Sequence, residues 1–243
     1  RGLPPAAVTV LDPAPSPRIE ALAAEGLHLN PEAPGPAEVC LLAVKPQKMA
    51  EAAPRVAPLA GTGTLFVSIA AGTPIRWFEA ALGEVPLVRA MPNTPAAVGR
   101  GISALIGNAR AGEAEMATAE SLLSAIGETV RLESESQMDA VTGLSGSGPA
   151  YVFHLIEAMA KAGEAEGLAP ELAMRLARAT VAGAGELARR SPEPAATLRE
   201  NVTSPGGTTA AGLSVLMDAG AGLAPLMART VAAAAARSRD LAG

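Results

Sequence analysis

The sequence predicts an α/β protein in which a doubly wound parallel sheet is followed by an all-α half. Short apolar runs of strand length alternate with helical stretches as far as about residue 133, and this alternation is typical of a parallel sheet covered by helices. After about residue 134 the strand signals stop, and helices rich in small residues follow. We therefore expect one domain over residues 1–133 and a second over residues 134–243.

Each strand of the first half is predicted by a short run of apolar or β-branched residues. The predicted strands are residues 8–12, 39–44, 63–69, 85–91 and 102–106. Between them, helices are expected at residues 16–25, from 46 toward 59, at 74–82 and at 111–126. Because ligands of such sheets bind beyond the carboxyl ends of the strands, the loops at Asp12, Val44–Pro46 and Ala71–Gly72 are expected to line one crevice.

The first predicted strand ends in an acid, Asp12. In a dinucleotide-binding fold such an acid stands about 20 residues after the glycine-rich turn that holds the pyrophosphate. Counting back from Asp12 by that distance passes Arg1. We therefore expect the sheet to lack its first strand and glycine loop here, since both would lie before residue 1.

The second half is predicted to be a set of closely packed helices. In the helix after Pro149, apolar residues such as Val152 and Ile156 fall on one face and charged residues on the other, as in an amphipathic helix. The helices expected at residues 171–189 and 223–240 carry alanine and glycine on almost every side, so we expect them to be buried between neighbours. Two interleaved chains would bury them more readily than one, which favours a homodimer or an oligomer of dimers.

Composition argues against several classes of function. The net charge is −5, the isoelectric point is near 5.2 and only 2% of residues are aromatic, so we expect no nucleic-acid partner. No apolar run of about 18 residues is present, so we expect no membrane span. The lone Cys40 fits a reducing, cytoplasmic location. His28 and His154 form no metal or triad pattern, so we expect neither metal catalysis nor hydrolysis.

The segment 201–213 has the pattern of an anion-binding helix start. Ser204 is a favourable N-cap residue and Pro205 is favourable at the first helical position, so we expect the helix to begin here. Gly206 and Gly207 leave first-turn amides uncovered, and these amides can bind a carboxylate or a phosphate. An ordinary capped helix with glycines for tight packing is the alternative.

Three blocks together, residues 90–99, 139–151 and 201–213, closely resemble the pyrroline-5-carboxylate reductase family. The resemblance runs in order from about Val8 to about Leu241. It implies a Rossmann-like domain, an intertwined helical dimer, and reduction of 1-pyrroline-5-carboxylate to L-proline by NADPH or NADH. This reaction is the last step of proline biosynthesis.

The resemblance also implies which residues bind each ligand. The expected cofactor-binding residues are Asp12, Asn30, Val44, Lys45, Pro46, Ala71, Gly72 and Asn93. The expected substrate-binding residues are Glu135, Asn201, Ser204, Gly206, Gly207, Thr208 and Thr209. Thr209 is the expected catalytic residue, with its hydroxyl bonded to the ring nitrogen. Asp12 favours NAD and Arg18 favours NADP, so the sequence leaves the cofactor preference open.

Two other functions are alternatives to a pyrroline-5-carboxylate reductase. A β-hydroxyacid dehydrogenase-like NAD(P) oxidoreductase has a similar two-domain pattern, with a catalytic lysine four residues after a Gly-x-Gly, but that position here is Val152. Lys161 lies nine residues further along, so this alternative lacks its general acid. A non-catalytic, cofactor-binding helical dimer is the second alternative. The uncovered amides at Gly206 and Gly207 argue against it, because a scaffold has no need of an anion site.

Overall fold

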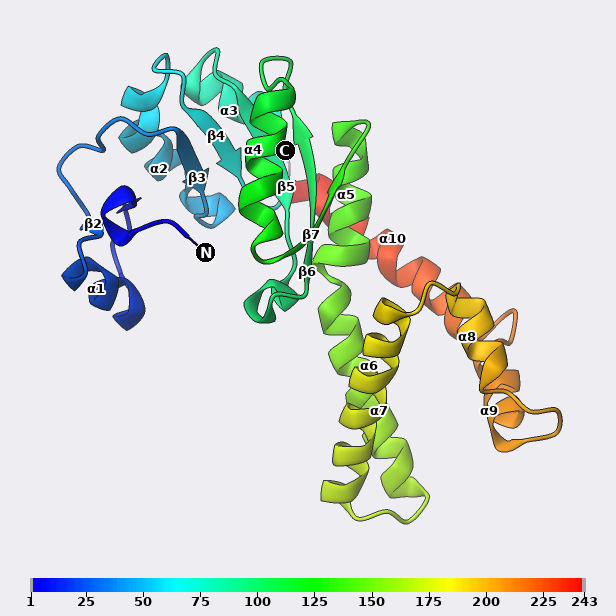
Figure 1. Cartoon of the computed structure of the whole chain (residues 1–243). Coiled ribbons are helices and arrows are strands. Elements are labelled where there is room, and N and C mark those ends of the chain that lie inside the picture. Colours follow the sequence, from blue (N-terminus) through cyan, green and yellow to red (C-terminus); the bar gives the residue numbers. More distant parts are fainter. Residues whose placement is uncertain (1, 242–243) are drawn as a thin grey trace. The chain divides into compact units, whose positions relative to one another are not determined.

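The computed structural model describes residues 2–241 and places most strands in one five-stranded sheet (Figure 1). Its strands are β3 (Val39–Leu42), β4 (Leu65–Ser68), β5 (Leu87–Met91), β6 (Gly101–Gly107) and β7 (Gly127–Arg131), in that spatial order. The strands β3, β4 and β5 are parallel, β6 is antiparallel to β5, and β7 is parallel to β6. The predicted α/β class with a mainly parallel sheet is confirmed.

The reversal at β6 corrects the prediction of a wholly parallel sheet. The connection from β5 to β6 covers only residues 92–100, including the 3-10 helix η4 (Thr94–Val98). A parallel crossover needs about a dozen residues or more, so a connection of this length returns the chain in the opposite direction. Gly99, at φ +68°, ends η4 in the left-handed region that glycine adopts without strain.

A separate two-stranded parallel sheet pairs β1 (Thr9–Val10) with β2 (His28–Leu29). The sequence predicted β1 but not β2, and it placed β1 in the same sheet as the later strands. In the described residues β1 and β3 are not hydrogen-bonded neighbours. The loop after β1 is therefore at the carboxyl edge of its own small sheet. The expected first strand and glycine loop lie outside the described residues.

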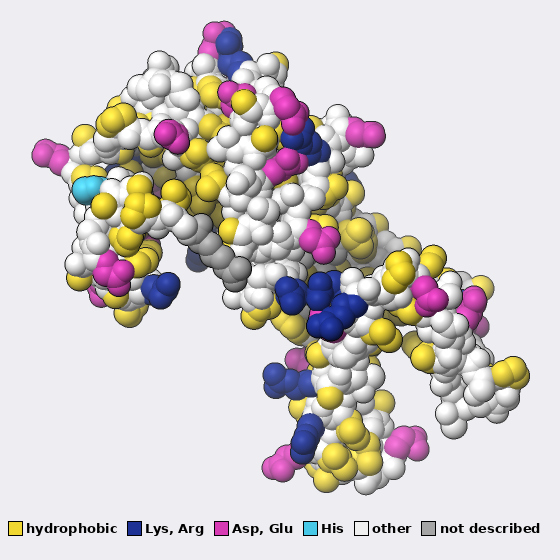
Figure 2. All heavy atoms as spheres, viewed as in Figure 1, with side chains coloured by type: hydrophobic (Ala, Val, Ile, Leu, Met, Phe, Trp, Pro, Cys, Tyr) yellow, Lys and Arg dark blue, Asp and Glu magenta, His cyan; other side chains and the backbone are white. Residues whose placement is uncertain are grey.

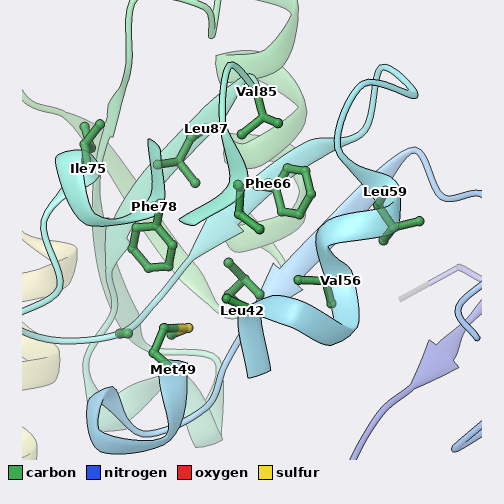
Figure 3. Packing of buried hydrophobic residues seen from close by; sticks show 12 residues of the cluster. Leu42, Met49, Val56, Leu59, Phe66, Ile75, Phe78, Val85 and Leu87 are labelled. Carbon is green, nitrogen blue, oxygen red and sulfur yellow. The ribbon is translucent and has the colours of Figure 1, made fainter. Parts of the chain in front are cut away.

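Both faces of the five-stranded sheet are covered, because side chains of successive strand residues point to opposite faces. On one face, Phe66 and Leu87 pack with Phe78 of α3 (Ile75–Leu82) and Met49 of α2 (Met49–Val56), as Figure 3 shows. On the other face, α4 (Glu113–Ser124) packs on the alternate residues of β4 to β6. These residues are Leu65, Val67, Val88, Ala90 and Leu105.

The edge strand β7 was not predicted, since Gly127-Glu-Thr-Val-Arg131 lacks an apolar run. Arg131 ties this strand to α4: its Nε donates to Glu120 at 2.7 Å and its Nη1 to Glu113 at 2.6 Å. These hydrogen bonds lower the pKa of both carboxyl groups. Because the pKa of each glutamate is lower in the folded state, its ion pair with Arg131 stabilises the fold above the ordinary pKa of 4.5. This contribution to stability is lost as the pH falls through the pKa of the folded state.

Arg131→Ala is therefore expected to raise the pKa of Glu113 and Glu120 toward the ordinary glutamate value. The effect on stability should be small, because all three side chains are in contact with solvent. Carboxyl-carbon NMR titration measures both groups directly. Unchanged titration curves in the variant would show that Arg131 does not hold the two carboxylates in solution.

The helices and shorter elements of the rest of the chain have the following bounds. The helices are α1 (Pro17–Ala24), α5 (Met138–Val141), α6 (Gly148–Ala165), α7 (Pro170–Arg190), α8 (Ala195–Asn201), α9 (Thr208–Leu216) and α10 (Leu223–Leu241). The remaining 3-10 helices are η1 (Pro5–Ala7), η2 (Pro46–Lys48), η3 (Ala57–Leu59) and η5 (Glu135–Gln137). The chain forms two compact units: one contains the described residues up to Asp139 together with 238–241, and the other is Ala140–Arg237.

In the helical unit, α6 and α7 form a hairpin that packs through small residues. Ala160, Ala173 and Ala177 are its buried contacts, with Ile156 beside them. Large apolar side chains of both helices nevertheless remain exposed, and Figure 2 shows hydrophobic side chains on the surface of this hairpin. They include Val152, Phe153, Leu155, Met159, Leu172, Met174, Leu176 and Leu187. A single chain therefore leaves α7 partly exposed, whereas the sequence predicts burial between neighbours, most readily in two interleaved chains.

The stretch Gly143–Gly148 before α6 is rich in glycine, which is typical of a turn between helices. The structure instead has a π-helix over Thr142–Gly146 that continues α5. Gly143 lies against α10: a Cβ at this position would be 2.9 Å from the carbonyl oxygen of Val231 and 3.0 Å from the nitrogen of Ala235. The hydroxyl of Tyr151 donates to the carbonyl of Gly143 at 3.0 Å and closes the π-helix onto α6.

Candidate active site

Three loops that follow parallel strands lie at one edge of the five-stranded sheet. They are Val44–Pro46 after β3, Ile69–Thr73 after β4 and Pro92–Asn93 after β5. Asn93 fixes the third loop, since its Oδ1 accepts a hydrogen bond from the amide of Ile102 at 3.0 Å. The tertiary structure thus brings together five of the predicted cofactor residues, which are Val44, Lys45, Pro46, Ala71 and Gly72, with Asn93 beside them.

The loop after β4 has little side-chain bulk. Gly72 has φ +72°, a conformation that favours glycine, and its neighbours Ala70 and Ala71 are small. The loop begins with a hydrogen bond from the amide of Ala70 to Ser68 Oγ at 3.3 Å. The small side chains of the loop itself leave room for a flat ring beside Ala71, which is half-buried.

Asp12 and Asn30 are joined at the carboxyl edge of the two-stranded sheet. The amide of Asp12 donates to Asn30 Oδ1 at 2.8 Å, and Asn30 Nδ2 donates to the carbonyl of Asp12 at 2.7 Å. Asn30 adopts φ +48° to make this pair of bonds. Asp12 Oδ1 accepts from the amide of Ala14 at 2.9 Å, which leaves the second carboxylate oxygen available to a hydroxyl donor. Asn30 therefore orients Asp12, a function that its sequence context did not suggest.

Glu135 lies beside the loop after β4 and is already paired. Its Oε1 accepts from Arg89 Nη1 at 2.6 Å and from the amide of Ile75 at 2.8 Å. The second bond caps the start of α3, where Pro74 provides no side-chain cap. The Arg89 side chain is only 6% exposed, against 32% for Glu135. Glu135, an expected substrate-binding residue, thus also forms an ion pair with Arg89.

The segment between α8 and α9 differs from the predicted helix start. The amide of Gly207 donates to the carbonyl of Ser204 at 3.0 Å, and Gly206 has φ +70°. Proline followed by a glycine at positive φ is typical of a type II turn, so Ser204–Gly207 closes a turn and the helix begins at Thr208. The prediction that the helix begins at Pro205 is wrong, because Gly206 cannot be helical at this φ.

The helix start remains open to a ligand even so. The first α9 hydrogen bond runs from the amide of Ala211 to the carbonyl of Gly207 at 3.2 Å, so the amides of Thr208 to Ala210 have no acceptor within the helix. Thr208 and Thr209 are both exposed. Asn201 lies at the end of α8, where its Nδ2 donates to Glu193 at 3.3 Å. This segment lies in the second compact unit, whereas Glu135 and the cofactor loops lie in the first.

Comparison with known proteins identifies the family. Residues 135–241 match the model of the pyrroline-5-carboxylate reductase dimerisation domain. A pyrroline-5-carboxylate reductase of Pseudomonas aeruginosa is 42% identical over 100% of this chain and 89% of its own length. This chain belongs to the pyrroline-5-carboxylate reductase family. A Synechocystis reductase is 44% identical over 87% of this chain and 78% of its own length.

Solved reductases of the family share the fold over nearly the whole chain. The Coxiella burnetii enzyme superposes with a TM-score of 0.91 at 33% identity, covering 100% of this chain and 91% of that one. The Plasmodium falciparum enzyme, solved with NADP bound, gives a TM-score of 0.79 at 27% identity, covering 97% and 87%. This enzyme therefore reduces 1-pyrroline-5-carboxylate to L-proline with NAD(P)H in proline biosynthesis, and it forms homo-oligomers.

Arg89 is the residue of this reductase that sequence reasoning missed. It is the charged residue within the otherwise apolar strand β5, and a buried strand rarely keeps a charge without a partner. That contrast was a usable signal, although the partner Glu135 is 46 residues away. Among residues 2–241, no group of three His, Cys, Asp or Glu side chains could hold a metal ion, and no helix is long and apolar enough to cross a membrane.

Proposed function

We propose that the start of α9 binds the carboxylate of pyrroline-5-carboxylate and that Thr209 is the catalytic residue of this reductase. The observation that carries the proposal is the combination of the Ser204–Gly207 turn with unsatisfied, exposed amides at Thr208 and Thr209. Gly206 and Gly207 contribute by the absence of side chains that would cover these amides. The N-terminal end of the helix dipole also favours a negative group there.

The same proposal assigns the remaining contacts. Asn201 and Ser204 are assigned to the carboxylate, and Glu135 is assigned to the substrate as a further contact. Thr209 Oγ1 accepts a hydrogen bond from the N–H of the protonated ring nitrogen, which orients the ring and favours its protonated form. A protonated imine is the better hydride acceptor, so a hydroxyl positioned at the nitrogen assists the reaction without a strong acid on the protein.

The cofactor residues fit a dinucleotide. Asp12 presents a carboxylate oxygen that a ribose hydroxyl can donate to, and Asn30 holds it in place. Ala71 and Gly72 offer the low bulk that a nicotinamide ring requires, and Val44, Lys45, Pro46 and Asn93 line the same sheet edge. When bound, the reduced nicotinamide supplies the hydride. The NADP-bound relative supports NADPH as one cofactor of this enzyme.

The helical half is assigned to the homodimer. Its exposed apolar side chains on α6 and α7 provide the surface that a second copy would cover, and the matched dimerisation model supports this use. We assign residues 1–133 to the cofactor and residues 134–243 to the substrate and the dimer. A cytoplasmic location is part of the proposal, supported by the use of a single cysteine, Cys40, with no second cysteine to form a disulfide within the chain.

Thr209→Ala is expected to lower kcat by about tenfold to a hundredfold, in the range for a positioned polar group, while NADPH affinity stays nearly unchanged. The matched control is Ser214→Ala in the same helix, whose hydroxyl bonds only to the carbonyl of Ala211. Steady-state kinetics with pyrroline-5-carboxylate measure both variants. Wild-type turnover in Thr209→Ala would remove this hydroxyl from the mechanism, and a large loss of NADPH affinity would assign the segment to the nucleotide instead.

A further inference from the structure

The last described turn of α10 is anchored by a partly buried hydrogen bond. Ser238 is 3% exposed, and its hydroxyl donates to Asp139 Oδ1 at 2.6 Å. The two residues are 99 positions apart in the sequence, and both belong to the first compact unit. Hydrogen bonds to an ionised carboxylate are short and strong, so this bond fixes the turn over residues 238–241 to the segment that follows η5.

The anchored turn lies directly against the loop after β4. A Cβ built on Gly72 would be 3.0 Å from Leu241 Cβ and 3.6 Å from both the carbonyl carbon and the carbonyl oxygen of Leu241. Two features of this position therefore require glycine: the backbone conformation at φ +72° and the close approach of Leu241. Gly72 and Thr73 are buried even though Leu241 itself is about half exposed, so the turn of α10 covers the loop.

The loop has a second support from the same short segment. Glu135 Oε1 accepts from the amide of Ile75 at 2.8 Å, immediately after the loop, and is itself held by Arg89. Residues 135–139 thus fix the loop in two ways, through Glu135 at its end and through Asp139 and Ser238 at Gly72. Ser68 Oγ fixes its beginning by accepting from the amide of Ala70.

We propose that Ser238 and Asp139 are positioning residues for hydride transfer, acting through the turn of α10 on the Ala71–Gly72 loop. This inference rests on the proposed function, in which that loop supports the nicotinamide ring. Neither side chain touches the reacting atoms. Hydride transfer depends steeply on donor–acceptor geometry, and displacements of about 1 Å can cost up to a hundredfold in rate. Releasing the turn therefore affects the chemical step more than it affects binding of the cofactor.

The test compares Ser238→Ala with Thr230→Ala in the full chain. Both changes remove a hydroxyl from α10, but Thr230 Oγ1 bonds only to the carbonyl of Leu226 in its own helix, at 2.9 Å. Ser238→Ala is expected to lower kcat by roughly threefold to tenfold and to raise the primary deuterium isotope effect with 4-deuterated NADPH. The dissociation constant for NADPH should change by less than about twofold, because the remaining cofactor contacts are intact. Thr230→Ala should match the wild type in all three.

Three further variants make the result independent of simple destabilisation. Asp139→Asn keeps an acceptor for the Ser238 hydroxyl and should lose less activity than Asp139→Ala, while Asp139→Ala combined with Ser238→Ala should cost no more than either alone. Wild-type kcat and isotope effect in Ser238→Ala, or an equal loss in Thr230→Ala, would overturn the inference. Thermal unfolding of each variant shows that the comparison is between folded enzymes.

Ala71→Val distinguishes a failure of this inference from a failure of the proposed cofactor placement. If the loop supports the ring, the added bulk should lower kcat or raise the KM for NADPH by about tenfold or more. If Ala71→Val loses activity while Ser238→Ala keeps wild-type activity, only the positioning role of Ser238 and Asp139 is overturned. Both variants at wild-type activity would overturn the placement of the nicotinamide ring and the positioning role together.

Discussion

Arg89→Ala is expected to lower the free energy of unfolding by about 3–5 kcal/mol, the range found when one partner of a buried ion pair is removed. Arg89 is nearly inaccessible, and its partner Glu135 would keep its charge at the start of α3 with only the amide of Ile75 bonded to it. Urea unfolding, followed at one fixed protein concentration because the enzyme is oligomeric, measures the loss.

Arg110→Ala is the matched control, because Arg110 pairs with Glu84 in the same unit but both side chains are exposed. Its loss should be about 0–1 kcal/mol. The double variant Arg89→Met with Glu135→Gln should recover part of the stability, since it leaves no uncompensated charge and glutamine still accepts from Ile75. Equal losses for Arg89→Ala and Arg110→Ala would contradict the importance of burial at this pair.

Gly207→Val is expected to lower kcat/KM for pyrroline-5-carboxylate by about a hundredfold, equivalent to the loss of one or two charge-assisted hydrogen bonds at roughly 1.5–3 kcal/mol each. A Cβ at this position would be 2.6 Å from Ser204 Oγ, which must rotate away, and 3.1 Å from the carbonyl oxygen of Ser204. Valine therefore crowds the turn beside the amides of Thr208 and Thr209. Steady-state titrations at saturating nucleotide measure the effect, with circular dichroism to show that the variant is folded.

Arg199→Ala separates this binding mode from recognition by a side chain. Arg199 is the arginine nearest in sequence to the segment, but it pairs with Glu200 at 3.2 Å and is partly exposed. We expect its replacement to change kcat/KM by less than about threefold, as for a surface ion pair. If Arg199→Ala strongly lowers kcat/KM while Gly207→Val leaves it near the wild-type value, a guanidinium holds the carboxylate. The start of α9 would then be only a helix end.

Local features were predictable because their causes are local. The apolar runs of β3, β4 and β5 and the capped start of α1 at Ser16 follow from the identity and spacing of neighbouring residues. The Pro205–Gly206 pair was informative too, but it was assigned to a helix start although proline followed by glycine also favours a type II turn. The conformation of Gly206, at φ +70°, distinguishes the two.

The sequence by itself determined the family and the reaction, because three blocks in a fixed order are specific to pyrroline-5-carboxylate reductases. The alanine- and glycine-rich helices expected at residues 171–189 and 223–240 also favoured a second copy of the chain. Only the tertiary structure decided the pairings across long sequence separations: Arg89 with Glu135, Ser238 with Asp139 and Asp12 with Asn30. Each of these polar groups has many possible partners in the sequence. The partner is fixed only when a sheet or α10 brings two of them within hydrogen-bonding distance. At Arg89 and Ser238, burial then makes an unpaired group costly.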